Sequence, residues 1–264
     1  MLWHYTDATA AVSMIRNKEF WASHVRHMND TGEMQQFADR IAQALRVQVK
    51  LPINSEIVES IERAIDGFES WLEVNYFVVS FSQEPDSLSQ WRGYGGTGQG
   101  YALGFAKSML TDINGWRLVE CAYVDEVARD FAAEIVNDGL RAVRAGGFEY
   151  EIPEGRVWQA IYPRAITEAP SVKDQAFREE REWRLVGGPF PGGSVEVRAG
   201  RRGMLPYVKL PWKVDGEGQY DLREIVAGPG AAEDTFHAME IATHHDALFP
   251  DFPRVLGSDV PYRA

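Results

Sequence analysis

Two neighbouring glutamates have the residue type and position that would suit catalysis at a sugar. Glu180 and Glu182 flank Arg181 just before the apolar run WRLV. If a strand begins at Glu180, both carboxylates point to the same face, and their repulsion raises one pKa unless a cation or solvent compensates. Arg178 and Arg184 are near in sequence, so a solvated strand start is the plain alternative. The chemical interpretation is a carboxylate that stabilises an electron-poor, oxocarbenium-like ribose.

Polar side chains in two other expected strands could complete such a site. His4 lies between aromatic residues in LWHYT, at the start of the chain. The residue pattern around His4, taken alone, predicts a residue in the core or at the edge of a sheet. Ser80 and Ser82 share one face of the run YFVVSFS. Serine nucleophiles usually occupy sharp turns, so these serines are interpreted as hydrogen-bonding groups of a site or as a strand end.

The segment LSQWRGY contains a third candidate pair, Trp91 and Arg92. Arginine binds phosphate in a bidentate manner, and tryptophan offers a face for stacking. The alternative is that Trp91 packs half-buried on the following strand GYALGF, with Arg92 at the surface. General considerations favour the two interpretations about equally.

Metal and dinucleotide motifs have weak support. His24, His27 and Asp30 are spaced three apart but lie in a loop-like segment, and no HExxH motif accompanies them. The segment GYGGTG satisfies G-x-G-x-x-G, yet a short helix precedes it and a strand follows. This order is the reverse of the dinucleotide-binding fingerprint, so Gly93, Gly95 and Gly98 are interpreted as a flexible turn.

Composition excludes several classes of protein. The chain has 264 residues, 45% of them hydrophobic, and a net charge of −12, which disfavours non-specific binding to nucleic acid or anionic membranes. The close arginines Arg198, Arg201 and Arg202 are interpreted as a solvated turn. The single cysteine, Cys121, lies in an apolar run and is expected in the core, which fits a reducing compartment. Because no signal peptide or long apolar run is visible, a cytoplasmic protein without membrane contact is expected.

The elements that would position these residues predict an α+β fold with a mixed, split β-sheet flanked by helices. The hydrophobic patterns indicate strands at 2–6, 76–82, 100–105, 116–124 and 180–187, with further strands after residue 194. Helices are expected at 33–49, 55–69, 126–144, 155–168 and 231–245, and the face of the first carries Phe37, Ile41 and Leu45. We expect one domain over residues 1–264, with a helical insert near residues 33–70.

Several motifs together resemble a bacterial family known only as a domain of unknown function. They are LWHYT, FWASH, FVVSFS, LSQWRGYG, GYALGF, EREWRLV, IVAGP and the closing VPYR, and they span nearly the whole chain. Members of this family are dispersed in genomes, often beside defence or mobile genes.

The order of motifs also resembles that of ADP-ribosyltransferase-like domains, which include DNA-modifying toxins and tRNA 2′-phosphotransferases. This resemblance implies that His4 bonds a ribose hydroxyl of NAD, that Ser80 and Ser82 hold the nicotinamide ribose, and that Glu182 stabilises the transition state. It assigns further contacts with the dinucleotide to Tyr5, Thr6, Trp91, Arg92 and Tyr101, with Glu180 beside the catalytic carboxylate. NAD would be consumed as a substrate, and no metal is expected.

The leading functional hypothesis is therefore NAD-dependent glycosyl transfer, by a phage-defence or toxin-like effector that modifies nucleic acid or protein. The first alternative is a non-catalytic domain that senses a small-molecule nucleotide or mediates an interaction. The second is a metal-dependent hydrolase or nuclease that uses His24, His27 and Asp30. Residue patterns do not decide the acceptor, the oligomeric state or the activating trigger.

Overall fold

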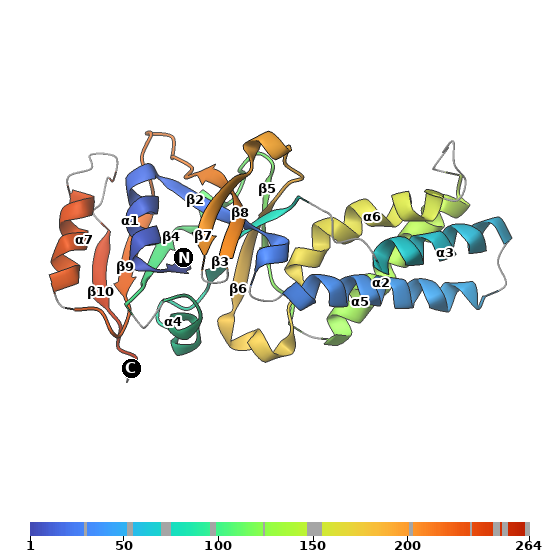
Figure 1. Ribbon diagram of the computed structural model, residues 1–264, viewed down its shortest axis with the longest axis horizontal. Helices are drawn as coiled ribbons and strands as arrows, with labels where there is room; N and C mark the ends of the chain where they lie inside the picture. The colour runs from blue at the N-terminus through green and yellow to red at the C-terminus, as the bar shows by residue number, and fades with distance from the viewer. Residues whose placement is uncertain are drawn as a thin grey trace. The chain divides into compact units, whose positions relative to one another are not determined.

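The computed structural model describes residues 1–28, 31–51, 55–69, 75–95, 99–123, 125–146, 155–200, 203–232, 234–244, 249 and 253–261. The chain forms two compact units, each assembled from separate segments (Figure 1). The first comprises Met1–His24, Tyr76–Glu120 and Arg178–Ala264, and the second comprises Val25–Asn75 and Cys121–Phe177. The predicted helical insert therefore belongs to the second unit, together with a later segment. The single-domain prediction stays a prediction.

The first unit contains a mixed sheet of ten strands in the described part of the chain. The order is β10-β9-β4-β1-β3-β2-β8-β7, with β6 on β3 and β5 on β6. The β9–β10 pair is parallel, and the other pairs of described strands are antiparallel. The strands are β1 (Leu2–Thr6), β2 (Glu19–His24), β3 (Phe77–Ser82), β4 (Tyr101–Phe105), β5 (Trp116–Glu120), β6 (Glu182–Gly187), β7 (Glu196–Gly200), β8 (Gly203–Pro211), β9 (Leu222–Ala227) and β10 (Arg254–Gly257).

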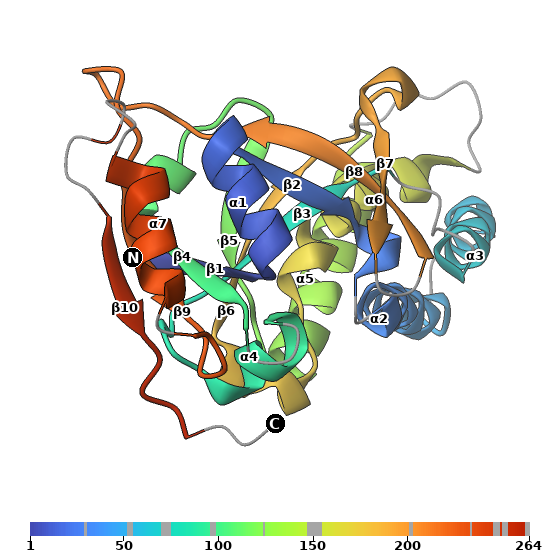
Figure 2. The same cartoon turned by 60° about the vertical axis from the view of Figure 1, so that its left-hand side comes forward.

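Helices cover the two faces of this sheet, as Figure 2 shows for α1 (Ala8–Asn17), α4 (Leu88–Tyr94) and α7 (Asp234–His244). The helix α1 begins where the Asp7 carboxylate accepts a hydrogen bond from the Ala10 amide at 2.9 Å. Its buried side chains Met14 and Ile15 share one core cluster with strand residues such as Leu103. The alternation of strand side chains sends a second, smaller cluster to the opposite face, where α4 packs.

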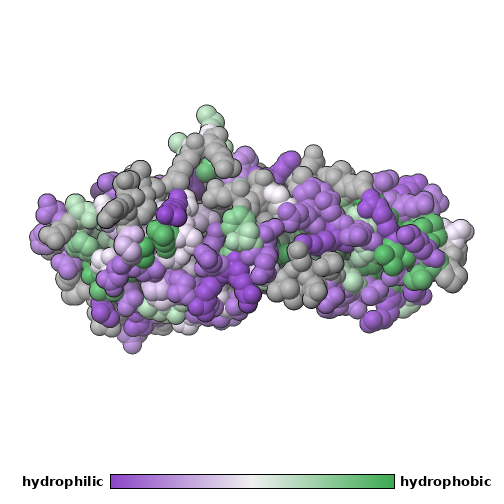
Figure 3. All heavy atoms as spheres, turned by 90° about the horizontal axis from the view of Figure 1, so that it is seen from below, coloured by the Kyte–Doolittle hydropathy of each residue, from purple (hydrophilic) through white to green (hydrophobic). Residues whose placement is uncertain are grey.

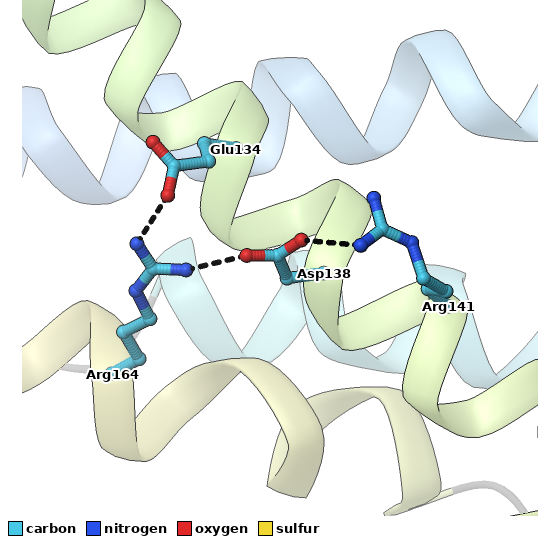
Figure 4. A network of polar contacts seen from close by, with 4 residues as sticks. All are labelled: Glu134, Asp138, Arg141 and Arg164. Carbon is cyan, nitrogen blue, oxygen red and sulfur yellow. Dashed lines mark hydrogen bonds and ion pairs between the residues drawn. The ribbon is translucent and has the colours of Figure 1, made fainter.

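The second unit is a bundle of α2 (Thr31–Val49), α3 (Ser55–Glu69), α5 (Asp125–Arg144) and α6 (Arg156–Glu168). The α2 helix packs on α3 and α5, and α6 packs on the same two helices. Phe37, Ile41 and Leu45 are fully buried, as their helical spacing predicts. On the outer side, Arg164 of α6 bonds Glu134 and Asp138 of α5 (Figure 4).

The expected elements are confirmed with small shifts at their ends. The first strand and the helix at 55–69 match their predicted bounds, and the helix at 33–49 begins two residues earlier. The α+β class and the mixed sheet are confirmed. Cys121 is buried, as predicted. No described helix is both long and apolar enough to cross a membrane, and hydrophilic residues dominate the face seen in Figure 3.

Candidate functional site

The sheet splits along one edge of β3. The strand β6 pairs with β3 from Phe77 to Ser82 and so occupies one whole edge. The strands β1 and β2 share the other edge: β1 pairs at Ser82, whereas β2 pairs at Phe77 and Val78. If both registers continued, two strands would have to lie opposite Ser80, which one edge cannot accommodate. The strands β1 and β2 therefore diverge at Ser80.

His4 occupies this split. Its Nδ1 lies 2.8 Å from the carbonyl oxygen of Ser80. A carbonyl only accepts, so Nδ1 donates, which leaves Nε2 as an acceptor in the neutral ring. Edge contacts with Phe20 and Phe81, at centroid distances of 5.9 and 5.7 Å, hold the ring. Burial, together with the positive charge of Arg198, lowers the pKa of His4 to about 4, so the ring is neutral at pH 7.

An arginine and two aromatic rings lie together on β2, β8 and β7, which are neighbours in the sheet. The Nη2 of Arg198 on β7 donates to the Ser23 hydroxyl at 3.1 Å. The guanidinium carbon lies 5.5 Å from the ring centre of Trp21 and 5.9 Å from that of Tyr207. We name Trp21, Ser23, Arg198 and Tyr207 the split cluster; His4 is influenced by the charge of Arg198, but its ring contacts Phe20 and Phe81. It offers a hydroxyl acceptor, a guanidinium and two aromatic rings.

The predicted trio of His4, Ser82 and Glu182 does not converge on one face. Ser82 lies opposite Trp3 on one side and opposite Glu182 on the other, so these three side chains share a face. His4 follows Trp3 and therefore points to the opposite face, where it contacts Phe81. The Ser82 hydroxyl donates to the Glu180 carbonyl at 2.7 Å and accepts from the Glu84 amide at 3.0 Å. Ser82 thus anchors local backbone.

Glu182 is paired within the protein. Its two oxygens accept from Nε and Nη2 of Arg184 at 2.8 and 2.9 Å, and both side chains are 3% exposed. The strand β6 begins at Glu182, and Arg181 before it has a φ of 43°, whereas Glu180 ends the 3₁₀ helix η5 (Gln175–Glu180). Glu180 and Glu182 therefore do not project as neighbours from one strand face, and this part of the expectation is wrong.

Tyr5 and Trp91 have structural contacts. The Tyr5 hydroxyl donates to the Glu84 carbonyl at 2.7 Å and accepts from the Ser87 amide at 3.0 Å, and burial raises its pKa. Trp91 is completely buried, edge-on to Tyr5, and its Nε1 donates to Asp86 at 2.6 Å. Since its ring is enclosed, Trp91 offers no face to a ligand, and the packing interpretation is the correct one.

The remaining predicted contacts are scattered over the first unit. Arg92 is exposed on α4. Thr6 and Tyr101 lie opposite one another on β1 and β4, both are buried, and burial raises the Tyr101 pKa. The Ser80 side chain points away from the His4 face, and only its carbonyl joins the site. Of the ten predicted residues, His4 and the Ser80 backbone thus belong to the split.

The remaining sequence motifs are the predicted metal ligands and the glycine-rich segment. His24 is buried with its ring edge-on to Phe77, and Asp30 lies outside the described residues. Among the described residues, no group of three His, Cys, Asp or Glu side chains could hold a metal ion. A short helix, α4, precedes β4 as predicted, but Gly93 lies inside α4, so the flexible-turn interpretation is wrong for this residue; Gly95 caps the helix, and Gly98 lies outside the described part.

Sequence reasoning missed Arg198, Trp21 and Tyr207. The expectation of a solvated turn is wrong for Arg198, which lies half-buried within β7; Arg201 and Arg202 fall outside the described residues. The available signal was the alternation in EVRAG and PYVKL, which places charged and aromatic residues on one strand face.

Comparison with known proteins adds one similarity. Residues 90–185 match the model of a family described as a protein of unknown function (DUF2971). The resemblance to an uncharacterised family is therefore confirmed, and this match includes most of LSQWRGYG, from Gln90 onward, together with the segments GYALGF and EREWRL that motivated it. No curated protein matches the chain, and no solved structure does.

Proposed function

We propose that the first unit binds a ribose-containing nucleotide at the sheet split, and that NAD is this ligand. The observation that carries the proposal is the neutral His4 ring with its Nδ1 proton held by the Ser80 carbonyl. A ring in this state presents Nε2 as an acceptor, which suits a ribose hydroxyl as the donor. No hydrogen bond from the described residues occupies Nε2. A first-strand histidine with this role is also what the resemblance to ADP-ribosyltransferase-like domains implies.

The chemical step that we propose for bound NAD is ADP-ribosyl transfer. The bond between nicotinamide nitrogen and ribose C1′ breaks, and its electron pair leaves with nicotinamide. A nucleophile of a nucleic acid, a protein or water then bonds to C1′ and releases its proton. The oxocarbenium-like transition state needs a nearby carboxylate. For Glu182 to serve it, the carboxylate would have to leave Arg184 and reach the ligand from the opposite face of the sheet.

The binding step is tested by calorimetry with NAD and ADP-ribose. The decisive variant is His4→Asn, because its amide nitrogen can still donate to the Ser80 carbonyl while the acceptor at Nε2 is lost. We expect this variant to fold normally and to bind NAD at least ~10-fold more weakly, as for a lost hydrogen bond of about 1.4 kcal/mol. In the matched variant His4→Gln, the side-chain amide oxygen can replace the acceptor, and part of the affinity should return. If His4→Asn binds like the wild type, the proposal is wrong.

The transfer step is tested by nicotinamide release. Wild-type protein should release nicotinamide from NAD, and Glu182→Gln should not. Because that variant removes the carboxylate charge of Glu182 from beside the buried Arg184, the double variant Glu182→Gln/Arg184→Met is the folded control. Binding without release by the wild type, over protein, DNA and RNA acceptors, would overturn transfer and leave a nucleotide-sensing module.

A further inference from the structure

Several arginines of the first unit pair with a carboxylate, whereas Arg198 does not do so among the described residues. Arg181 pairs with Glu84, Arg184 with Glu182, and Arg254 with Glu224. Arg198 forms no ion pair with the described residues, although it is more enclosed than the exposed Arg181 and Arg254. Removing a guanidinium from water is unfavourable unless a counter-charge or hydrogen bonds compensate.

Glu196 and Asp7, two carboxylates of the strands and helix around Arg198, are engaged with other partners. Glu196, two residues earlier on the same face of β7, accepts from Lys209 and from the Tyr207 hydroxyl, each at 2.7 Å. Asp7 caps α1 through the Ala10 amide and affects Arg198 only as a nearby charge. The chain therefore surrounds Arg198 with groups that orient it and with carboxylates that serve other partners.

The hydrogen bonds of the guanidinium are also incomplete. Nη2 donates to Ser23, whereas the enclosed Nε has no acceptor among the described residues. The rings of Trp21 and Tyr207 compensate part of the positive charge through their faces but accept no strong hydrogen bond. Of the Arg198 nitrogens, only Nε is both enclosed and without a partner, so the Nη1 edge is open to a ligand.

We infer that Arg198 binds a phosphate or diphosphate group, with Trp21 and Tyr207 as flanking rings and Ser23 holding the guanidinium in place. A planar guanidinium with donors on two edges matches the oxygens of a phosphoryl group. The inference deepens the proposed function and rests on it only for the nucleotide as the source of the phosphate. Lys209 is not part of this site because Glu196 neutralises it.

The test uses pyrophosphate and adenosine as separate probes of the full chain. Pyrophosphate should bind the wild type, and Arg198→Met should weaken it at least ~10-fold, as expected for the loss of charge-assisted hydrogen bonds. Arg198→Lys keeps the charge without the planar fork and should give an intermediate affinity. Arg178→Met, an exposed arginine of the same unit, controls for net charge and should bind pyrophosphate like the wild type.

The two proposals fail in different ways. If pyrophosphate does not bind the wild type, or binds Arg198→Met equally well, the phosphate site is wrong. If pyrophosphate binding depends on Arg198 while NAD and adenosine do not respond to His4→Asn, the phosphate site stands and the nucleotide proposal fails. Should Arg198→Met not fold, as judged by circular dichroism, Ser23→Ala provides the second variant. It removes the bond that orients Arg198, and it should weaken pyrophosphate binding without changing the net charge.

Discussion

Glu182 and Arg184 face one another as a buried bidentate ion pair, two residues apart on β6. Both carboxylate oxygens are used, and both side chains lie beside the Ser80 and Ser82 positions of β3. The pair turns a charge-rich strand start into a buried, oriented element of the sheet. A glutamate held in this ion pair stabilises its own strand. Its carboxylate would have to leave Arg184 before it could act in catalysis.

Breaking this ion pair should strongly destabilise the first unit. Glu182→Gln leaves a buried guanidinium without its counter-charge, at an expected cost of about 3–5 kcal/mol in the free energy of unfolding. The double variant Glu182→Gln/Arg184→Met should be more stable than Glu182→Gln alone, since the buried charge of Arg184 is removed as well. Urea unfolding of the wild type, both single variants and the double variant measures this coupling. Strictly additive effects of the two substitutions would contradict a direct pair.

The lowered pKa of His4 predicts a loss of stability in acid. Between pH 6.5 and about 4, the unfolded chain takes up a proton at His4 that the folded protein does not. The free energy of unfolding should therefore be fully retained above pH 6.5 and fall by on the order of 3 kcal/mol by pH 4. Urea unfolding at a series of pH values, compared with His4→Asn, isolates this contribution. Equal pH dependence in the two proteins would show that His4 titrates normally.

Asp86 should hold the end of the described chain against the first unit. Its Oδ1 accepts from Trp91 at 2.6 Å and from Ser258 at 2.6 Å, and its Oδ2 accepts from the Asp259 amide at 2.7 Å. In Asp86→Asn, the side-chain NH₂ cannot accept, so we expect a loss of about 1–3 kcal/mol and faster hydrogen exchange at the Asp259 amide. Asp112→Asn, at an exposed position, is the control. An unchanged exchange rate at Asp259 would contradict the role of Asp86.

In the helical unit, the buried face of α2 should contribute far more to the free energy of unfolding than the ion network in Figure 4. Arg164 bonds Glu134 and Asp138 at 2.6 and 2.8 Å, but all three side chains are at least 36% exposed. Arg164→Met should therefore cost less than about 1 kcal/mol. Leu45 is fully buried, and Leu45→Ala should cost about 2–5 kcal/mol. Thermal and urea unfolding compare the two variants, and a reversed order would show that the network dominates.

Local patterns in the sequence were sufficient to predict most of the helices and strands. The period of Phe37, Ile41 and Leu45 fixes the buried face of α2, because these side chains recur on one side of a helix whatever it packs against. Alternation along LWHYT likewise separates His4 from Trp3 and Tyr5. Such patterns depend on neighbours within a few residues, so they are readable before any long-range contact is known.

The positions of the site residues depend on pairing between strands that are far apart in the sequence. Which strand takes which edge of β3 depends on contacts between residues 53 to 110 positions apart in the sequence. That choice separates His4 from Ser82 and Glu182, and the pairing of β2 with β8 and of β8 with β7 brings Arg198 beside Trp21. Register is set by the sum of many side-chain contacts across strands, and a slip of one residue reverses every face. The residue types at the split were visible in the chain; their partners were settled by folding.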